Sequence, residues 1–437
     1  MNDSPSYEPV VYDLPKEVKG PVQDEPNKNS IVGLVLLVAG FLALAVFLPY
    51  WAIFAFAIIV MIFLHELGHY LTAKWSDMKV TEFFIGFGPR IGSFVRGETE
   101  YGVKAIPAGA YVKVIGMSNL EEVDPVDEPR TYREKSYPRR LAVGLAGSAM
   151  HFLIALVCLF VLLSMIGLPG GKLGANPLTD DGWVIETVED GSAADDAGLR
   201  PGDRIISIDG ASVSTFDDLR VVITDRPDEP IDIVIERGDE VLTLDTTLGS
   251  RTRNGASQGF LGVSPTLPTV TYGPVEAAGR SFVEFGRITK LTGQSLVQFF
   301  SPSGLADFFG EATGDRPVPP PSGGGESIEG EGSNRVLSIL GALRLGAELT
   351  EAGFAQFLQI FILLNIFVGV FNLIPLLPLD GGHVAVATYE RLRSRNGQRY
   401  HADVAKLLPV AYAVVAILVV VGVTALYLDI VDPLTID

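Results

Sequence analysis

Two histidines and a glutamate stand at the spacing of a metal site in the segment IVMIFLHELGHYLTAKW. His65 and His69 are four residues apart, and Glu66 follows the first of them. On a helix, positions four apart lie on the same face, so both imidazoles can bind one metal ion. Zinc suits two neutral imidazoles and a third protein ligand, and its open position holds a water whose pKa falls toward neutrality. The pattern predicts a zinc site in which Glu66 accepts the proton of that water.

The segment that carries this motif is apolar enough to lie inside a lipid bilayer. Ionisable side chains are costly at that depth, and they are retained where they have a partner or a function. The alternative is a buried polar cluster that only holds helices together. Three ionisable residues within five positions favour metal binding over that alternative.

A third metal ligand is expected far along the chain, in the segment FNLIPLLPLDGGH. Asp380 follows an apolar run that ends with Pro375 and Pro378, and prolines break a helix. Irregular backbone in a membrane must face protein or water, so this segment predicts an active-site wall. Asp380 is the preferred ligand, and His383, which follows two flexible glycines, is the alternative. Asn372 is expected to be a buried amide that binds the substrate backbone or the oxyanion, or that bridges two helices.

The chain resembles the site-2 protease family of intramembrane zinc metalloproteases in three segments. They are HELGH at 65–69, NLIPLLPLDGGH at 372–383, and the segment at 86–117, which looks like the membrane-associated hairpin of the branch with PDZ domains. The resemblance implies that zinc is held by His65, His69 and Asp380. It also implies that Glu66 is the general base.

Other residues in the apolar segments have simpler interpretations. His151 stands where the family usually has an asparagine, and hydrogen bonding between helices is favoured over a role at the metal site or at the substrate. Gly144, Gly147 and Ser148 form a small-residue face that predicts close helix packing. Cys158 is the single cysteine, so a disulfide within the chain and a cysteine zinc site are excluded.

The composition combines strong hydrophobicity with strong acidity. Of the 437 residues 48% are hydrophobic, and the formal net charge is −19. Apolar spans must therefore alternate with very acidic exposed parts. Such acidity keeps proteins soluble in concentrated salt and predicts a halophilic, archaeal source, with acidic linkers that bind nothing as the alternative. Nucleic acid is excluded as a partner, because no basic patch rises above this background.

Five apolar segments are predicted to cross roughly 30 Å of hydrocarbon as helices. They lie at about 30–48, 50–74, 139–167, 355–377 and 404–428. The loops at 76–137 and 384–403 carry eight and four Lys or Arg, so the positive-inside rule places both in the cytosol. The N-terminus is then cytosolic, and the HELGH motif and Asp380 both lie near the cytosolic leaflet of the cell membrane.

The segment at 182–223 resembles a PDZ domain and is expected outside the cytosol. Ala197 to Leu199 would end a short helix, Pro201 and Gly202 would form a turn, and Asp209 with Gly210 would close a hairpin. PDZ domains bind an extended peptide by strand addition or bind its terminal carboxylate. Whether this domain recruits such a partner or sterically filters substrates is open at this stage. Further along, 314–335 is expected to be a flexible linker and 334–349 an amphipathic helix on the membrane surface.

The predicted fold is a polytopic α-helical membrane protein with about five transmembrane helices, a membrane-associated β-hairpin region and an extracytoplasmic α/β PDZ domain. In chain order, the predicted parts are a disordered cytosolic N-terminus (1–29), two transmembrane helices with the HELGH motif (30–75), a cytosolic-side loop with the hairpin (76–137), a transmembrane helix (138–168), the PDZ domain (178–250), a linker and amphipathic region (251–354), a transmembrane helix with the proline and Asp-Gly motif (355–383), a cytosolic loop (384–403) and a last transmembrane helix (404–428).

The predicted function is intramembrane cleavage of the transmembrane segments of other membrane proteins, with zinc as cofactor and the lipid bilayer as surroundings. An intact helix hides its backbone, so a substrate must unwind, and pairing with the segment at 86–117 would hold it extended. One alternative is a non-catalytic scaffold with a structural metal site and a recruiting PDZ domain. Glu66 disfavours it, because a closed structural zinc site needs no carboxylate to polarise water. A protease for soluble substrates that is only anchored to the membrane is disfavoured because the motif lies inside the span.

Overall fold

The computed structural model describes residues 30–117, 121–253, 256–313, 337–394 and 400–431. The predicted disordered N-terminus at 1–29 and the predicted linker at 314–335 lie outside these residues.

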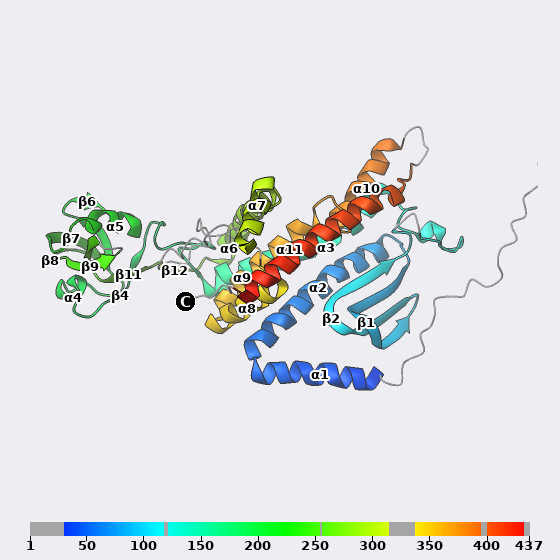
Figure 1. Ribbon diagram of the computed structural model, residues 1–437, viewed down its shortest axis with the longest axis horizontal. Coiled ribbons are helices and arrows are strands. Elements are labelled where there is room, and N and C mark those ends of the chain that lie inside the picture. The colour runs from blue at the N-terminus through cyan, green and yellow to red at the C-terminus, as the bar shows by residue number, and fades with distance from the viewer. Residues whose placement is uncertain (1–29, 118–120, 254–255, 314–336, 395–399, 432–437) are drawn as a thin grey trace, which may run out of the picture.

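Within the described residues, four helical segments are long and apolar enough to cross a membrane. They are formed by α2 (Pro49–Trp75), α3 (Tyr137–Val161) with the π-helical turn η2 (Leu162–Ile166), α9 (Phe354–Asn372), and α11 (Leu408–Val431) with part of the 3-10 turn η3 (Val404–Leu407). The remaining predicted span corresponds to α1 (Ser30–Phe47). Its described apolar part, Val35–Phe47, is shorter than the four helical segments that could cross a membrane. Figure 1 shows α2, α3 and α11 running in a common diagonal direction, whereas α1 turns back beneath α2.

Prolines set several of the helix boundaries. α2 begins at Pro49, and Pro138 stands in the first turn of α3, where a missing backbone N–H costs nothing. The helix predicted over 355–377 was wrong at its end, because α9 stops at Asn372. The backbone then turns through Pro375 and Pro378 before α10 (Asp380–Arg393) begins. Proline cannot donate to the helical hydrogen-bond ladder, so the break begins before the first proline.

A long β-hairpin of β1 (Val80–Arg96) and β2 (Thr99–Val114) lies beside α2 (Figure 1). It begins at Val80, earlier than the segment at 86–117 that the sequence indicated. Residues 82–85 pair on both sides, with 100–103 and with 110–113, while 90–96 pair with 99–104. The hairpin is therefore folded back on itself, and residues 110–114 form one of its edges.

Ion pairs fasten the turn of this hairpin to the end of α2. Glu98 accepts hydrogen bonds from Arg130 Nη1 at 2.6 Å and from Lys74 Nζ at 2.5 Å. The hydrogen bond from Arg130, followed by that from Lys74, lowers the pKa of Glu98 to about 2. Because Arg130 ends the 3-10 turn η1 (Glu128–Arg130), one carboxylate joins three segments that lie apart in the sequence.

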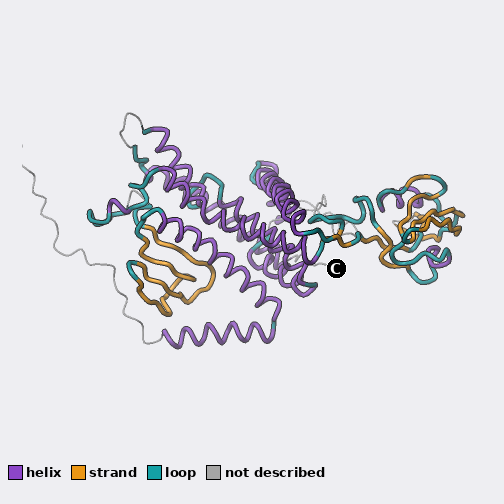
Figure 2. The backbone as a smooth tube through the Cα atoms, turned by 180° about the vertical axis from the view of Figure 1, so that it is seen from behind, coloured by secondary structure: helices purple, strands orange, loops and turns teal. Residues whose placement is uncertain are grey.

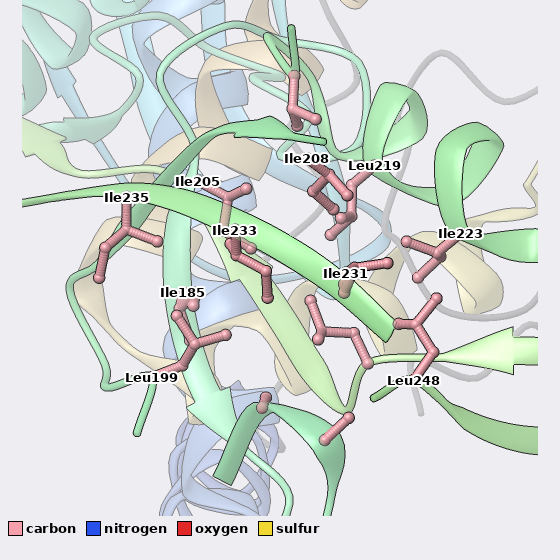
Figure 3. Close-up of a cluster of buried hydrophobic side chains, with 14 of the residues drawn as sticks. Ile185, Leu199, Ile205, Ile208, Leu219, Ile223, Ile231, Ile233, Ile235 and Leu248 are labelled. Carbon is pink, nitrogen blue, oxygen red and sulfur yellow. The ribbon is translucent and has the colours of Figure 1, made fainter. Parts of the chain in front are cut away.

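A separate α/β unit lies at the far end of the long axis in Figure 1. Its four-stranded sheet has the order β6-β5-β7-β8. Its elements are β4 (Val184–Val188), α4 (Ala193–Asp196), β5 (Arg204–Ile208), β6 (Ala211–Ser212), α5 (Phe216–Thr224), β7 (Pro230–Arg237), β8 (Glu240–Thr247), β9 (Gly249–Arg253), β10 (Ala256–Phe260) and β11 (Val263–Thr266). Figure 3 shows its core, where isoleucines of the sheet meet Leu219 and Ile223 of α5.

The predicted turns of this unit are present, but its predicted end is too early. Gly198, Gly202 and Gly210 all have positive φ, which a glycine adopts without steric cost. The predicted boundary at 250 excludes β11, which pairs with β4 and so closes the unit. Two short strands flank it, β3 (Leu168–Pro169) and β12 (Thr269–Val270), and they pair with each other. The chain therefore enters and leaves the unit at the same place.

The described residues between this unit and α9 form helices, in a region that the sequence predicted as a linker and an amphipathic segment. They are α6 (Pro274–Phe299), α7 (Pro302–Thr313) and α8 (Ile339–Ala352). α6 packs against α3 and α9, and its apolar stripe has a helical period that could have revealed it. α8 overlaps the amphipathic helix predicted over 334–349, and it packs on α2 and α9. Its Gly346 permits this contact, because a Cβ there would overlap the ring of Phe54. Figure 2 shows these helices clustered with the spans.

Candidate active site

The two histidines of the HELGH motif converge from one face of α2. The Nε2 atoms of His65 and His69 lie 3.2 Å apart, as their spacing of four residues predicts. Gly68 lets α3 approach this part of α2, because a Cβ there would lie 2.8 Å from the carbonyl oxygen of Ala146. Both imidazoles therefore face α3 at close range.

Asp380 joins them from the first position of α10. Its Oδ2 lies 3.2 Å from His69 Nε2 and 3.5 Å from His65 Nε2. One ligand atom from each of the three residues lies within 4.8 Å of the others. No other group of three His, Cys, Asp or Glu meets this criterion in the part of the chain that the structure describes.

The donors and acceptors of this cluster suit a cation. His69 Nδ1 donates to the carbonyl oxygen of Val143 at 2.8 Å, so a neutral His69 presents an unprotonated Nε2 to the cluster. Asp380 Oδ2 is buried and has no hydrogen-bond partner. Two imidazole nitrogens and a carboxylate oxygen therefore face one point, and this set matches the ligands of catalytic zinc.

A glycine on α3 leaves the space that the imidazoles occupy. A Cβ at Gly147 would lie 2.3 Å from His65 Cε1 and 2.5 Å from His69 Nε2. The sequence predicted that Gly144, Gly147 and Ser148 serve helix packing. Gly147 serves packing at the position where α3 contacts the imidazoles of both His65 and His69.

We expect Gly147→Ala to lower the cleavage rate by about 10²-fold, because displacing a reacting group by about 1 Å has a cost of that order. The Cβ would push both imidazoles away from Asp380. Gly422→Ala in α11 is the matched control, because a Cβ there would meet no atom within 4 Å. Zinc content and cleavage rate of both variants check this, and equal losses in the two would contradict the special role of Gly147.

α3 also positions the helix that carries Asp380. Arg140 Nη1 donates to Glu390 Oε2 at 2.6 Å, and both side chains are buried. One turn away, the hydroxyl groups of Tyr137 and Thr388 lie 3.2 Å apart. A charge-assisted hydrogen bond in a buried place is directional, so it sets the register of α10 against α3.

Glu66 lies beside the cluster without belonging to it. Its Oε1 is 4.0 Å from His65 Nε2, and its side chain is 17% exposed. Its carboxylate also interacts with the backbone of Val112, in the edge segment of the hairpin. A carboxylate at this distance can reach a water held at the cluster.

The other predicted site residues lie outside the cluster. Asn372 was expected to be buried, but it is half-buried at the last position of α9, and its side-chain amide makes no hydrogen bond to any described residue. His383 is half-buried with its ring edge-on to Tyr132, and it is not in the ligand group. Gly381 was interpreted as flexible. It is buried, and a Cβ there would lie 2.4 Å from the carbonyl oxygens of residues 373 and 374. The position therefore has no room for a larger residue.

Sequence reasoning missed one residue near the site. Asn365 of α9 is fully buried, and its Oδ1 lies 3.1 Å from His151 Nδ1. The interhelical hydrogen bonding expected of His151 is thus present. An amide inside an apolar span was the available signal for Asn365, since such groups need hydrogen-bond partners.

Comparisons with known proteins agree with this geometry. The family model for peptidase family M50 matches residues 53–310 and 327–418. The chain is 32% identical over 415 residues to the zinc metalloprotease Rip1 of Mycolicibacterium smegmatis, covering 88% of this chain and 98% of that protein. Rip1 of Mycobacterium tuberculosis is 31% identical over 410 residues, covering 87% of this chain and 97% of that protein.

A solved structure is similar to a smaller part of the chain. It is the PDZ domain of the SdrC-like protein from Listeria monocytogenes, with 25% identity, and it covers 20% of this chain and 90% of that one. Its TM-score is 0.18, which is too low to carry an argument.

Proposed function

The chain belongs to peptidase family M50 and is a zinc metalloprotease, and from this premise we propose that it cleaves transmembrane segments of other membrane proteins. The observation that carries the proposal is the position of the ligands. His65 and His69 lie inside α2, a helix long and apolar enough to cross a membrane, and Asp380 follows the end of another such helix. A substrate that reaches these residues must enter the bilayer.

We assign the roles by the atoms that face the cluster. His65, His69 and Asp380 would hold zinc, and zinc in such a site acts as a Lewis acid on the scissile carbonyl and on a water. Glu66 accepts the proton of the attacking water at its carboxylate and passes it to the leaving amine. Val143 holds the tautomer of His69 through its carbonyl group. Asn372 stays a proposal for binding the substrate backbone, because its amide has no partner among the described residues.

The hairpin supports the proposal that the substrate is bound in extended form. Residues 110–114 form an edge against α2, and Val112 of this edge adjoins Glu66. A strand added to that edge would satisfy the backbone groups of an unwound helix inside the membrane. It would also run past the carboxylate that accepts the proton.

Charge and composition support the remaining parts of the proposal. The Lys and Arg residues of the loops at 76–137 and 384–403 favour a cytosolic N-terminus, an active site toward the cytosolic leaflet and an extracytoplasmic PDZ-like unit. The net charge of −19 supports work in concentrated salt. The relatives named above are bacterial, and an archaeal source stays a prediction.

Cleavage of a single-span model substrate by the purified protein tests the proposed function. We expect a cut within the transmembrane segment, mapped by mass spectrometry of both fragments. A chelator should stop the reaction and added zinc should restore it. Cuts found only in the soluble parts of the substrate would instead support the anchored protease.

The PDZ-like unit is proposed to act as a filter or as a recruiting domain. A cavity of about 200 Å³ lies between α5 and residues 258–263, where a peptide end could bind. The pairing of β3 with β12 brings the two ends of the unit together. A short Gly/Ser linker can therefore replace the unit, here taken as residues 178–266, without separating α3 from α6.

If the unit is a filter, its deletion should let the enzyme cut an intact substrate that it normally spares until the outer domain is trimmed. If the unit recruits, deletion should slow the cleavage of trimmed substrates by lowering their effective concentration. Rates for both substrates, with and without the unit, separate the two. Thr224→Trp is the matched control, because it fills the cavity and leaves the bulk of the unit in place.

A further inference from the structure

His151 is a buried residue beside the metal site that the proposed mechanism does not use. It is 1% exposed, and its ring centroid lies 4.9 Å from that of His65, about as close as the ring of His69 at 4.8 Å. It stands one helical turn after Gly147 on α3, so the two residues bracket the His65 imidazole. Its nitrogens do not join the group of ligand atoms.

The hydrogen bond between His151 and Asn365 determines which nitrogen of His151 carries the proton. The Asn365 Nδ2 group donates to the carbonyl oxygen of Phe361 at 2.8 Å, which fixes the orientation of the amide. Its Oδ1 therefore faces His151 Nδ1, and this oxygen can only accept. A neutral His151 must carry its hydrogen on Nδ1, and its Nε2 is left as an acceptor.

The neighbouring ring of His65 has a donor that requires an acceptor. His65 Nε2 faces His69 and Asp380, so zinc bound there leaves the hydrogen of a neutral His65 on Nδ1. That Nδ1 atom is buried and has no hydrogen-bond partner. A histidine that binds a metal almost always donates its other N–H to an acceptor, and the backbone of Gly147 is the competing group nearby.

We propose that His151 is a positioning residue whose Nε2 accepts a hydrogen bond from His65 Nδ1 when the site holds zinc. The inference rests on the proposed zinc ligands and does not depend on the substrate. It extends the chain of contacts from Phe361 through Asn365 and His151 to His65. α9 would then orient the first ligand through this chain and the third ligand through the turn that leads from its end to Asp380.

Zinc affinity without substrate tests this hydrogen bond. We expect His151→Phe to weaken zinc binding about 10- to 100-fold in competition with a chromogenic chelator, as is usual when the partner of a ligating histidine is lost. His151→Gln is the matched variant, because its amide can still accept from His65, and it should retain affinity within about threefold of the wild type. Wild-type affinity in His151→Phe would overturn the proposal and assign the Nδ1 hydrogen to the backbone of Gly147.

A second variant keeps the proposal testable if His151→Phe does not fold. Asn365→Leu leaves the His151 ring in place but removes the acceptor that fixes its tautomer, so zinc affinity should again fall by about 10-fold or more. Thermal unfolding of the zinc-free proteins shows whether the fold is kept. Unchanged zinc affinity in a folded Asn365→Leu protein, or a rise in KM with normal affinity in folded His151→Phe, would overturn the positioning role. A failure of intramembrane cleavage alone would leave these binding results unaffected.

Discussion

Glu66→Gln should abolish proteolysis while zinc stays bound. The amide keeps the shape of the carboxylate, but it cannot accept the proton of the attacking water. A positioned general base contributes about 10²- to 10⁴-fold, so we expect a loss of at least about 10²-fold in the cleavage rate. Zinc content and cleavage of a single-span substrate by the same preparation check this. Glu66 Oε1 lies 4.0 Å from His65 Nε2, and Glu66 is outside the ligand group. The substitution should therefore not release the zinc.

The matched control is a carboxylate of the hairpin beside α2 that does not belong to the cluster. Glu100 pairs with Arg90 at 2.6 Å, and Glu100→Gln should cleave at close to the wild-type rate. A wild-type cleavage rate in a Glu66→Gln protein that retains its zinc would contradict the assignment of Glu66 as the general base. Loss of zinc in that variant would instead make Glu66 part of the metal site.

Asp380→Ala should lose most of its zinc, and His383→Ala should keep it. Asp380 supplies one of three protein ligands, and its Oδ2 lies within 3.5 Å of both imidazole nitrogens. Removing one ligand of three leaves a site with too few donors for tight binding. His383 points its ring edge to Tyr132, so its loss should alter packing more than coordination. We expect the cleavage rate of Asp380→Ala to fall at least as far as that of Glu66→Gln.

Metal content after dialysis measures both variants on one scale. Asp380→Glu adds a useful intermediate, because it keeps the carboxylate but displaces it by one methylene. The opposite ranking, with zinc kept by Asp380→Ala and lost by His383→Ala, would move the third ligand to His383. Equal retention in both would place the third ligand outside α10.

The candidate metal site of this protein could be predicted from the amino-acid sequence alone. His65 and His69 can be paired without a structure, because a helix places positions four apart on one face. The apolar spans can be read from hydropathy, since a bilayer has one thickness and a helix one rise per residue. Asp380 could also be predicted, because prolines in an apolar run indicate irregular backbone. Irregular backbone inside a membrane occurs only next to protein or water.

The boundaries of the helices and strands and the packing between them were harder to predict from the sequence. The end of α9 at Asn372 and the helix α6 had local signals, namely the prolines that follow and an apolar stripe of helical period. The strand β11 instead depends on its pairing with β4, which local periodicity does not contain. The apolar stripe of an amphipathic helix such as α8 has the same pattern whether it faces lipid or protein. α8 packs on α2 and α9, and the sequence of α8 alone does not identify these partners.

The role of α3 at the site is visible only once the helices are packed together. Gly147 and His151 lie one turn apart on a helix that contributes none of the three ligands, yet one leaves room for both imidazoles and the other adjoins His65. The pairing of His151 with Asn365 joins residues more than 200 positions apart. Such contacts depend on the distance between packed helices, and that distance is set jointly by every side chain along both, so no single segment of sequence carries it.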